Sequence, residues 1–371
     1  MNSTDLRQRL ADYHSFLYLA WAVSNDHSSA SNEFHTALSS VSEFLSTASS
    51  RDIHDRGKTI ETRLRKLVEA HEGAMPRKID VGEIAHDFRL LVNTEPDVWR
   101  HGISHGWLQD RFDLSQLPQA KDLPRHARIG IGIHAGRVSV EEGSLLDDMF
   151  FLLVRARKSF ENLQSFAHTQ TTEPDSLPDR RRYKVISALN SSVCTYSRLG
   201  VLTAAAFVEA FVNSVGWNEA ASRQDISESE KNVLLGKDTR NKGYLSLEKK
   251  LEGMPRIIGR ESPIVISDKK QMKEPFISFL RETKQVRDAS MHYAPGKTPI
   301  LLPPDEWLQL VESSVKHAVS AAREFWAACY PGRQQPEYLA GLYYEGLQQY
   351  ALDRLAAAED VAIAPPDSLY S

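Results

Sequence analysis

The segment Ala204–Ser214 reads AAAFVEAFVNS and is apolar on nearly every side of a helix. A helix of this kind has no face that favours water, so other elements have to surround it. This segment lies within the apolar stretch Leu199–Val215, which is short for a membrane span. The stretch also carries two polar residues, Glu209 and Asn213, which a membrane span would disfavour. We therefore expect a buried central helix of a soluble bundle, within one long helix over Tyr183–Val215 or two helices in line around Gly200.

Apolar residues recur at helical spacing along most of the chain. These stripes run from Leu6 to Leu17, Phe34 to Ala48, Ile60 to Val68, Ile84 to Val92, Leu145 to Phe166, Leu308 to Phe325 and Glu337 to Ala358. The best hairpin signal is the alternation of isoleucine with glycine and histidine from Ile129, which continues past Gly136 to Val140. Residues 263–267 and 299–303 are two further short segments that we expect to pair as strands.

These patterns predict a mainly α fold with four parts. Residues 1–140 form an N-terminal helical region of unknown role with a small β-hairpin. Residues 141–182 form a helix and a linker, and the prolines Pro174 and Pro178 place the linker at Thr169–Arg182. Residues 183–330 form a helical bundle, and residues 331–371 form a C-terminal helix and tail.

Composition narrows the class of protein. The 371 residues carry a net charge of −4, which argues against a protein that coats nucleic acid by bulk attraction. The segment from Lys231 to Lys273, however, contains eleven basic and five acidic residues, and Arg180–Arg182 forms a second basic cluster. These basic stretches are either solvated surface or an RNA footprint. The two cysteines lie in apolar helical sequence, and the N-terminus lacks a secretory layout, so we expect a cytoplasmic protein.

The most informative polar residue is Arg287. It continues a helical stripe of apolar or small residues at Phe276, Phe279, Leu280, Thr283 and Val286. A guanidinium stays charged and is costly to bury alone, so an anion or a carboxylate has to lie opposite it. Five positions later comes His292, the residue type best suited to proton transfer near neutral pH. An arginine for a phosphate and a histidine for a proton are the parts needed to cleave RNA without a metal.

Spacing alone is weak evidence, because the same arginine–histidine spacing recurs by chance, for example from Arg100 to His105. Only the Arg287 match combines an inward-pointing arginine, a polar residue after it and a helix stop just beyond the histidine. On an ideal helix, residues five apart point about 140° away from each other. Arg287 and His292 therefore converge only if the helix unwinds before Pro295–Gly296, or if a second subunit completes the site.

Residues 183–330 resemble a HEPN domain, the higher-eukaryote and prokaryote nucleotide-binding superfamily of small helical bundles. The resemblance rests on the RDASMH match at Arg287–His292 and on the inner-helix segment Ala206–Asn213 with its embedded Glu209. It also rests on the order of the elements: long inner helices, a basic segment that includes Leu245–Leu251, the helix that carries the Arg287–His292 motif, and a last helix that completes the bundle. The first half of the chain has no recognised counterpart.

The resemblance implies a metal-independent endoribonuclease that acts on RNA, often as a toxin or in defence against phage. The site of such enzymes forms across a homodimer, and an antitoxin or regulatory protein is a further partner. His292 would then be the general acid/base, and Arg287 would hold the phosphate and its developing charge. Asp288 matches the polar position that orients either residue, and Glu209 reaches the site or pairs with Arg287. No cofactor and no metal are expected, since phosphate-loop and dinucleotide glycine patterns are absent.

Each of these residues also has a purely structural interpretation. Arg287 forms an ion pair with Glu209 or Glu282, and His292 interacts with the last carbonyls of its helix. Glu209 and Asn213, one turn apart, form a buried polar pair. Three classes of function follow: a dimeric HEPN-type ribonuclease, a non-catalytic HEPN-like module for dimerisation or partner binding, and an unrelated helical interaction protein.

Overall fold

The computed structural model describes residues 3–23, 31–72, 78–95, 97–114, 123–131, 138–172, 178–239, 241–260, 266–269, 271–291, 301–335 and 344–360. Helices make up most of these residues, which confirms the mainly α class. Backbone contacts divide the chain into two units, Met1–Val140 and Glu141–Ser371. Each unit has its own buried apolar cluster and is described by itself.

The first four helices of the N-terminal unit follow the apolar stripes of the sequence, and the two short helices after them were not predicted. In chain order, the helices are α1 (Ser3–Val23), α2 (Ser31–Thr47), α3 (Ser50–Glu72), α4 (Val81–Thr94), α5 (Val98–His101) and α6 (His105–Arg111). Helix α1 packs against both α3 and α4, and its residues Leu10, Phe16 and Leu17 are fully buried. A Cβ at Gly57 would lie 2.6 Å from Leu6 Cδ2, so α3 packs closely against the Leu6 side chain of α1 at this glycine.

A small antiparallel sheet completes the N-terminal unit. Strand β2 (Arg128–Ile129) pairs with β3 (Val138–Ser139), with Ile129 opposite Val138, which confirms the predicted hairpin. Strand β1 (Ile103–Ser104) joins the other edge of β2 and was not expected from the sequence. Gly102 precedes it with a positive φ of 70°, and a Cβ there would lie 2.3 Å from the Ile129 carbonyl oxygen. Only glycine fits this turn.

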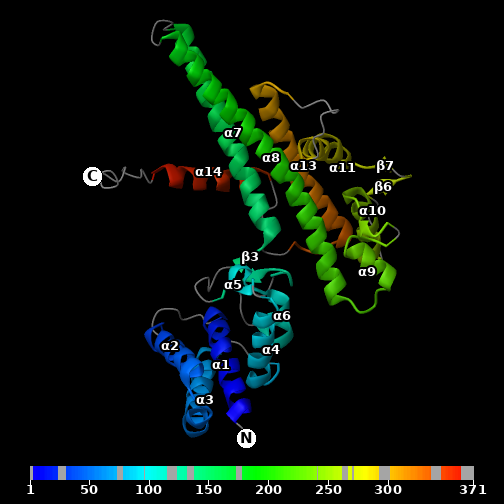
Figure 1. Cartoon of the computed structure of the whole chain (residues 1–371). Coiled ribbons are helices and arrows are strands. Elements are labelled where there is room, and N and C mark those ends of the chain that lie inside the picture. The colour runs from blue at the N-terminus through cyan, green and yellow to red at the C-terminus, as the bar shows by residue number, and fades with distance from the viewer. Residues whose placement is uncertain are drawn as a thin grey trace. The chain divides into compact units, whose positions relative to one another are not determined.

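Three long helices form the centre of the C-terminal unit (Figure 1). Helix α7 (Glu141–Thr172) packs along α8 (Asp179–Ser222), and α13 (Pro304–Cys329) packs against both. The Ser214 hydroxyl of α8 donates a 3.0 Å hydrogen bond to Glu142 Oε2 near the start of α7, so these two helices are antiparallel. Phe207, Phe211 and Phe325 lie in the core between α8 and α13.

Helix α8 is one continuous helix through Gly200. A Cβ at Gly200 would lie 2.5 Å from Val311 Cγ2, so the glycine allows α8 and α13 to approach closely. The predicted linker Thr169–Arg182 is wrong at both ends, because α7 continues to Thr172 and α8 begins at Asp179. Helix-compatible residues such as Arg180–Arg182 extend α8 after Pro178; residues 173–177 lie outside the described residues.

Shorter elements surround the three long helices, and the last of them, α14 (Tyr344–Asp360), packs mainly against α7. Those before it are α9 (Glu228–Leu234), β4 (Lys237–Asp238), β5 (Gly243–Tyr244), α10 (Leu247–Ile258), β6 (Ser267–Asp268), β7 (Gln271–Met272), α11 (Phe276–Ser278), η3 (Phe279–Lys284) and α12 (Gln285–Met291). Ser267 pairs with Met272 in a tight hairpin, and residues 301–303 form no strand. The expected pairing of residues 263–267 with residues 299–303 is therefore wrong for the described part of these segments. Closing a hairpin across a few residues costs less chain entropy than pairing two segments that lie about thirty residues apart.

Helix α8 is the one helix in the described ranges that is long and apolar enough to cross a membrane by length and composition. More than half of its apolar window, 56%, is buried inside the bundle by neighbouring helices. A core helix of a soluble protein has the same properties. The structure is therefore compatible with a soluble protein.

Candidate functional site

The motif helix consists of α11, η3 and α12 in direct succession and packs against α8 and α13. Phe276, Phe279 and Thr283 are buried, as the apolar stripe predicted. The middle segment η3 is a π-helix, in which one turn holds an extra residue. Such turns shift the side chains that follow them around the helix axis and occur frequently at functional sites. Arg287 lies one turn beyond this segment.

Arg287 faces the central helix. Its side chain is 22% exposed, and Nη2 lies 2.6 Å from Oε2 of Glu209 on α8. Nη1 lies 2.9 Å from Asp288 Oδ1. The carboxylate required opposite the arginine is thus Glu209, and not Glu282, which pairs with Arg281 at 3.1 Å. Two carboxylates fix the guanidinium while part of it stays accessible to solvent.

Asp288 extends the contacts to a third helix. It accepts a 2.7 Å hydrogen bond from Lys284 Nζ, and the same ammonium lies 3.4 Å from Oε1 of Glu248 on α10. Burial disfavours the charged ammonium, but the hydrogen bond with Asp288 and the two nearby carboxylates raise the pKa of Lys284 overall. Lys284 therefore stays charged and anchors the motif helix to α10.

Lys250, also on α10, is the most buried cation of the group. It is 5% exposed, and its ammonium donates a 2.8 Å hydrogen bond to Oδ1 of Asn213 on α8. Burial lowers the pKa of Lys250, and the charge of nearby Glu209 partly opposes this shift. A Cβ at Gly236, which has a φ of +65°, would lie 2.9 Å from Lys250 Cε. The glycine thus lets the preceding turn close over the lysine stem.

These contacts correct one sequence interpretation. Glu209 and Asn213 do not form a buried polar pair, because the Glu209 side chain is 37% exposed and Asn213 is exposed. They lie one turn apart on the edge of α8 that faces α10 and α12. The core side of α8 carries Phe207, Val208 and Phe211 instead, so the polar stripe is left for contacts with cations.

The structure brings together three of the four predicted site residues: Glu209, Arg287 and Asp288. His292 lies outside the described residues, and α12 extends to Met291. Sequence reasoning missed Lys250, although the signal was present. Lys250 falls on the apolar stripe of α10, which is formed by Leu247, Leu251 and Met254. This is the same pattern that singled out Arg287.

We call the resulting group the tri-helix charge cluster: Glu209 and Asn213 from α8, Glu248 and Lys250 from α10, and Lys284, Arg287 and Asp288 from the motif helix. It combines three carboxylates with three cations. Within the described ranges no group of three His, Cys, Asp or Glu side chains is placed to hold a metal ion. The chemistry that the cluster itself offers is recognition of an anion by fixed N–H donors.

Exposed aromatic rings lie close to the cluster. Trp217 is 42% exposed and lies one turn beyond Asn213 on α8. Tyr244 is 86% exposed and pairs with Lys237 in the β4–β5 hairpin, next to Gly236, which contacts Lys250. Exposed rings beside lysines are the features on which unpaired nucleic-acid bases stack.

Comparison with protein families, with curated proteins and with solved structures finds no match to this chain.

Proposed function

We propose that this protein is a metal-independent endoribonuclease of the HEPN type that cleaves RNA at the tri-helix charge cluster. The observation that carries this proposal is the state of Arg287. Its guanidinium is fixed by Glu209 and Asp288, at 2.6 and 2.9 Å, yet remains partly exposed. A guanidinium held in this way needs no reorganisation to stabilise charge that develops on a phosphate.

In the reaction, the ribose 2'-oxygen attacks the adjacent phosphorus, and the bond from phosphorus to the 5'-oxygen breaks. One proton leaves the 2'-hydroxyl, and another is delivered to the 5'-oxygen. The products are a 2',3'-cyclic phosphate and a 5'-hydroxyl. Arg287 binds the phosphate through the donors that its two carboxylate contacts leave available. His292 serves as general acid/base, as the motif implies.

The other cluster residues have supporting roles. Glu209 and Asp288 orient the guanidinium, and Lys284 links Asp288 to Glu248 of α10. Lys250 adds a second, nearly buried positive charge that Asn213 holds in place. A cation in a poorly solvated position interacts strongly with a phosphate that reaches it. Trp217 and Tyr244 stack unpaired bases, and the basic stretch Lys231–Lys273 contacts the RNA backbone.

The protein acts as a homodimer through the motif-bearing bundle, in the cytoplasm, as a toxin or phage-defence effector under the control of an antitoxin or regulatory protein. In a dimer, Arg287 of one subunit and His292 of the other can lie at the same site, so the helix between them does not have to unwind. Sedimentation at micromolar concentration should give twice the 41.8 kDa mass of the chain. A monomer under these conditions contradicts the dimeric site.

The purified chain should cleave single-stranded RNA in the presence of EDTA and leave a 2',3'-cyclic phosphate. A substrate with a single 2'-deoxy substitution should be intact at that position, because the nucleophile is missing there. Equal cleavage of DNA, or complete loss of activity in EDTA that added metal restores, would show that the proposed chemistry is wrong.

A second function has one observation in its favour. The three cations of the cluster are matched by three carboxylates, so the group is neutral as a whole and stabilises the contact of three helices without any ligand. Because the ion pairs need no ligand, this balance favours a non-catalytic HEPN-like module for dimerisation or partner binding as the alternative. In that case the dimer forms normally and the wild-type chain does not cleave RNA. The Arg287→Ala variant then binds RNA no more weakly than the wild-type chain does.

A further inference from the structure

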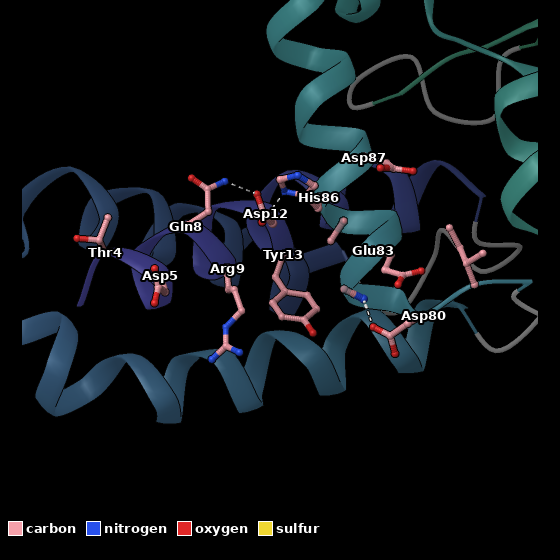
Figure 2. A pocket seen from close by; sticks show the side chains of 13 residues that line it. Thr4, Asp5, Gln8, Arg9, Asp12, Tyr13, Asp80, Glu83, His86 and Asp87 are labelled. Carbon is pink, nitrogen blue, oxygen red and sulfur yellow. Dashed lines mark hydrogen bonds and ion pairs between the residues drawn. The ribbon is translucent and has the colours of Figure 1, made fainter. Parts of the chain in front are cut away.

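A groove between α1 and α4 of the N-terminal unit forms a pocket of about 770 Å³, drawn in Figure 2. The two helices are antiparallel, because Arg89 Nη1 contacts the Gln8 carbonyl at 3.4 Å and His86 Nδ1 contacts Asp12 Oδ2 at the same distance. This volume lies within the range of roughly 300–1,000 Å³ that is usual for small-molecule sites. The residues that line it are Thr4, Asp5, Gln8, Arg9, Asp12, Tyr13, Ile79, Asp80, Gly82, Glu83, Ala85, His86 and Asp87.

Carboxylates dominate the charge of this pocket. Asp12 and Asp87 are neutralised by Arg89 and Arg111, at 3.2 and 2.6 Å. Asp80 and Glu83 have no basic partner in the described parts of the chain; the Asp80 carboxylate accepts a 2.7 Å hydrogen bond from the Gly82 N–H.

The single arginine of the lining does not offset these carboxylates. Arg9 pairs with Glu61 of α3 at 3.1 Å, so its charge is already matched. The N-terminus of α4 contributes a positive partial charge of roughly half an elementary unit. The full charges of Asp80 and Glu83 outweigh it. The pocket therefore favours a positively charged ligand.

The hydroxyl of a largely buried tyrosine supplies an independent sign of a ligand. Tyr13 is only 6% exposed and lines the pocket, yet its hydroxyl makes no hydrogen bond within the described residues. Figure 2 shows this hydroxyl directed toward the space between Arg9 and Asp80. Gly82 borders the same space, because a Cβ there would lie 3.7 Å from the hydroxyl. A phenolic oxygen that opens into the pocket can accept a hydrogen bond from the N–H group of a ligand.

The remaining lining is apolar. The ring of Tyr13 and the side chains of Ile79 and Ala85 offer contacts to methylene groups. We propose that the pocket binds the primary ammonium group of an aliphatic amine, with the nitrogen between the Tyr13 hydroxyl and the carboxylates of Asp80 and Glu83. Polyamines and lysine side chains share this chemistry. The ammonium donates charge-assisted hydrogen bonds, and its methylene chain lies along the apolar lining.

Calorimetric titration of the full chain at low ionic strength tests this site. The probes are spermidine, putrescine and lysine blocked at both its backbone amino and carboxyl groups, with magnesium chloride and sodium sulfate as comparisons. Saturable binding of an amine, unaffected by magnesium at the same concentration, supports the proposal. Tighter binding of spermidine identifies free polyamines as the source, and tighter binding of blocked lysine identifies a protein side chain.

Conservative variants locate the binding. Asp80→Asn keeps a side chain that caps α4 but removes the charge, and Glu83→Gln changes an exposed residue. Each should weaken amine binding roughly twofold to fivefold, and the double variant about tenfold. Tyr13→Phe should weaken it about fivefold through the lost hydrogen bond. Glu43→Gln, an exposed carboxylate of α2 outside the pocket, is the matched control and should change nothing.

Three results would overturn the proposal. One is the absence of amine binding to the wild-type chain. Another is equal loss of affinity in Glu43→Gln, which would indicate attraction to surface charge in general. The third is magnesium or sulfate binding that the pocket variants weaken while amine binding is unchanged. Circular dichroism of each variant establishes that the fold is retained, so that a change in affinity reports on the pocket.

Discussion

Arg287 Nη2 and Glu209 Oε2 lie 2.6 Å apart and join the motif helix to the central helix across 78 positions of sequence. The contact has two consequences at once. It satisfies a charge on the inward face of the motif helix, and it fixes the direction of a guanidinium that stays partly exposed. A structural ion pair and a phosphate-binding arginine are therefore compatible descriptions of the same residue, and experiments have to separate them.

The first prediction concerns catalysis. His292→Ala should lower the rate of RNA cleavage by on the order of 100-fold, because proton transfer is lost. Arg287→Ala should cost a similar factor, and Arg287→Lys should restore little, because a point charge does not reproduce the guanidinium fork. The measurement is the single-turnover rate on a short RNA.

The matched control for that series is Arg281→Ala. Arg281 lies on the same helix, and its side chain is 67% exposed. The chance arginine–histidine match at His105 is not a suitable control, because His105 is fully buried in the N-terminal unit and its loss would test stability. Cleavage that survives both site substitutions would rule out the cluster as the active site.

The second prediction separates stability from function at the ion pair. A double-mutant cycle with Glu209→Gln and Arg287→Gln should give a coupling free energy of about 0.5–1 kcal/mol in urea unfolding, since both side chains are partly exposed. The coupling should fall with added salt. A coupling of about 3 kcal/mol or more would instead indicate a structural pair of the buried kind.

The third prediction concerns Lys250. Lys250→Met should keep or raise the free energy of unfolding, because a nearly buried ammonium is costly, while RNA cleavage falls by about tenfold or more. Lys158→Met, at an exposed lysine of α7 that lies outside the basic stretch Lys231–Lys273, should leave cleavage nearly unchanged. If Lys250→Met destabilises the fold and leaves cleavage intact, the lysine is structural only.

The fourth prediction concerns alkaline pH. Burial, and then the charge of Glu219 at a 2.7 Å hydrogen bond, raise the pKa of Tyr330 far above its ordinary value. The unfolded chain releases this proton near pH 10 and the folded chain does not, so the stabilising effect is complete below about pH 10 and is lost as the pH rises further.

Tyr330→Phe should therefore make the free energy of unfolding less dependent on pH above 10. Tyr344 has its pKa raised by burial too and should leave a residual slope of the same sign. Urea unfolding at several alkaline pH values measures the wild-type chain and the Tyr330→Phe variant. An unchanged slope in Tyr330→Phe would contradict the assignment.

The sequence by itself determined which segments are helical and which faces they bury. Helical spacing of apolar residues reports burial directly, so it located α1, α4, α7 and α13, and the alternation after Ile129 located the β2–β3 hairpin. It also identified Arg287 as an inward-facing cation and offered Glu209 as its partner. Ends of elements were placed less well, as at Thr172 and Asp179, because surface residues near a proline are compatible with helix or loop.

Only the tertiary structure decided which distant side chains meet. Lys250 and Asn213 are 37 positions apart, and Tyr13 lines a pocket with Asp80 from another helix. Periodicity gives the face on which a residue lies but not the helix that packs against that face, because packing depends on crossing angles and on close approaches such as that at Gly200. The tri-helix charge cluster and the acidic pocket are products of that packing.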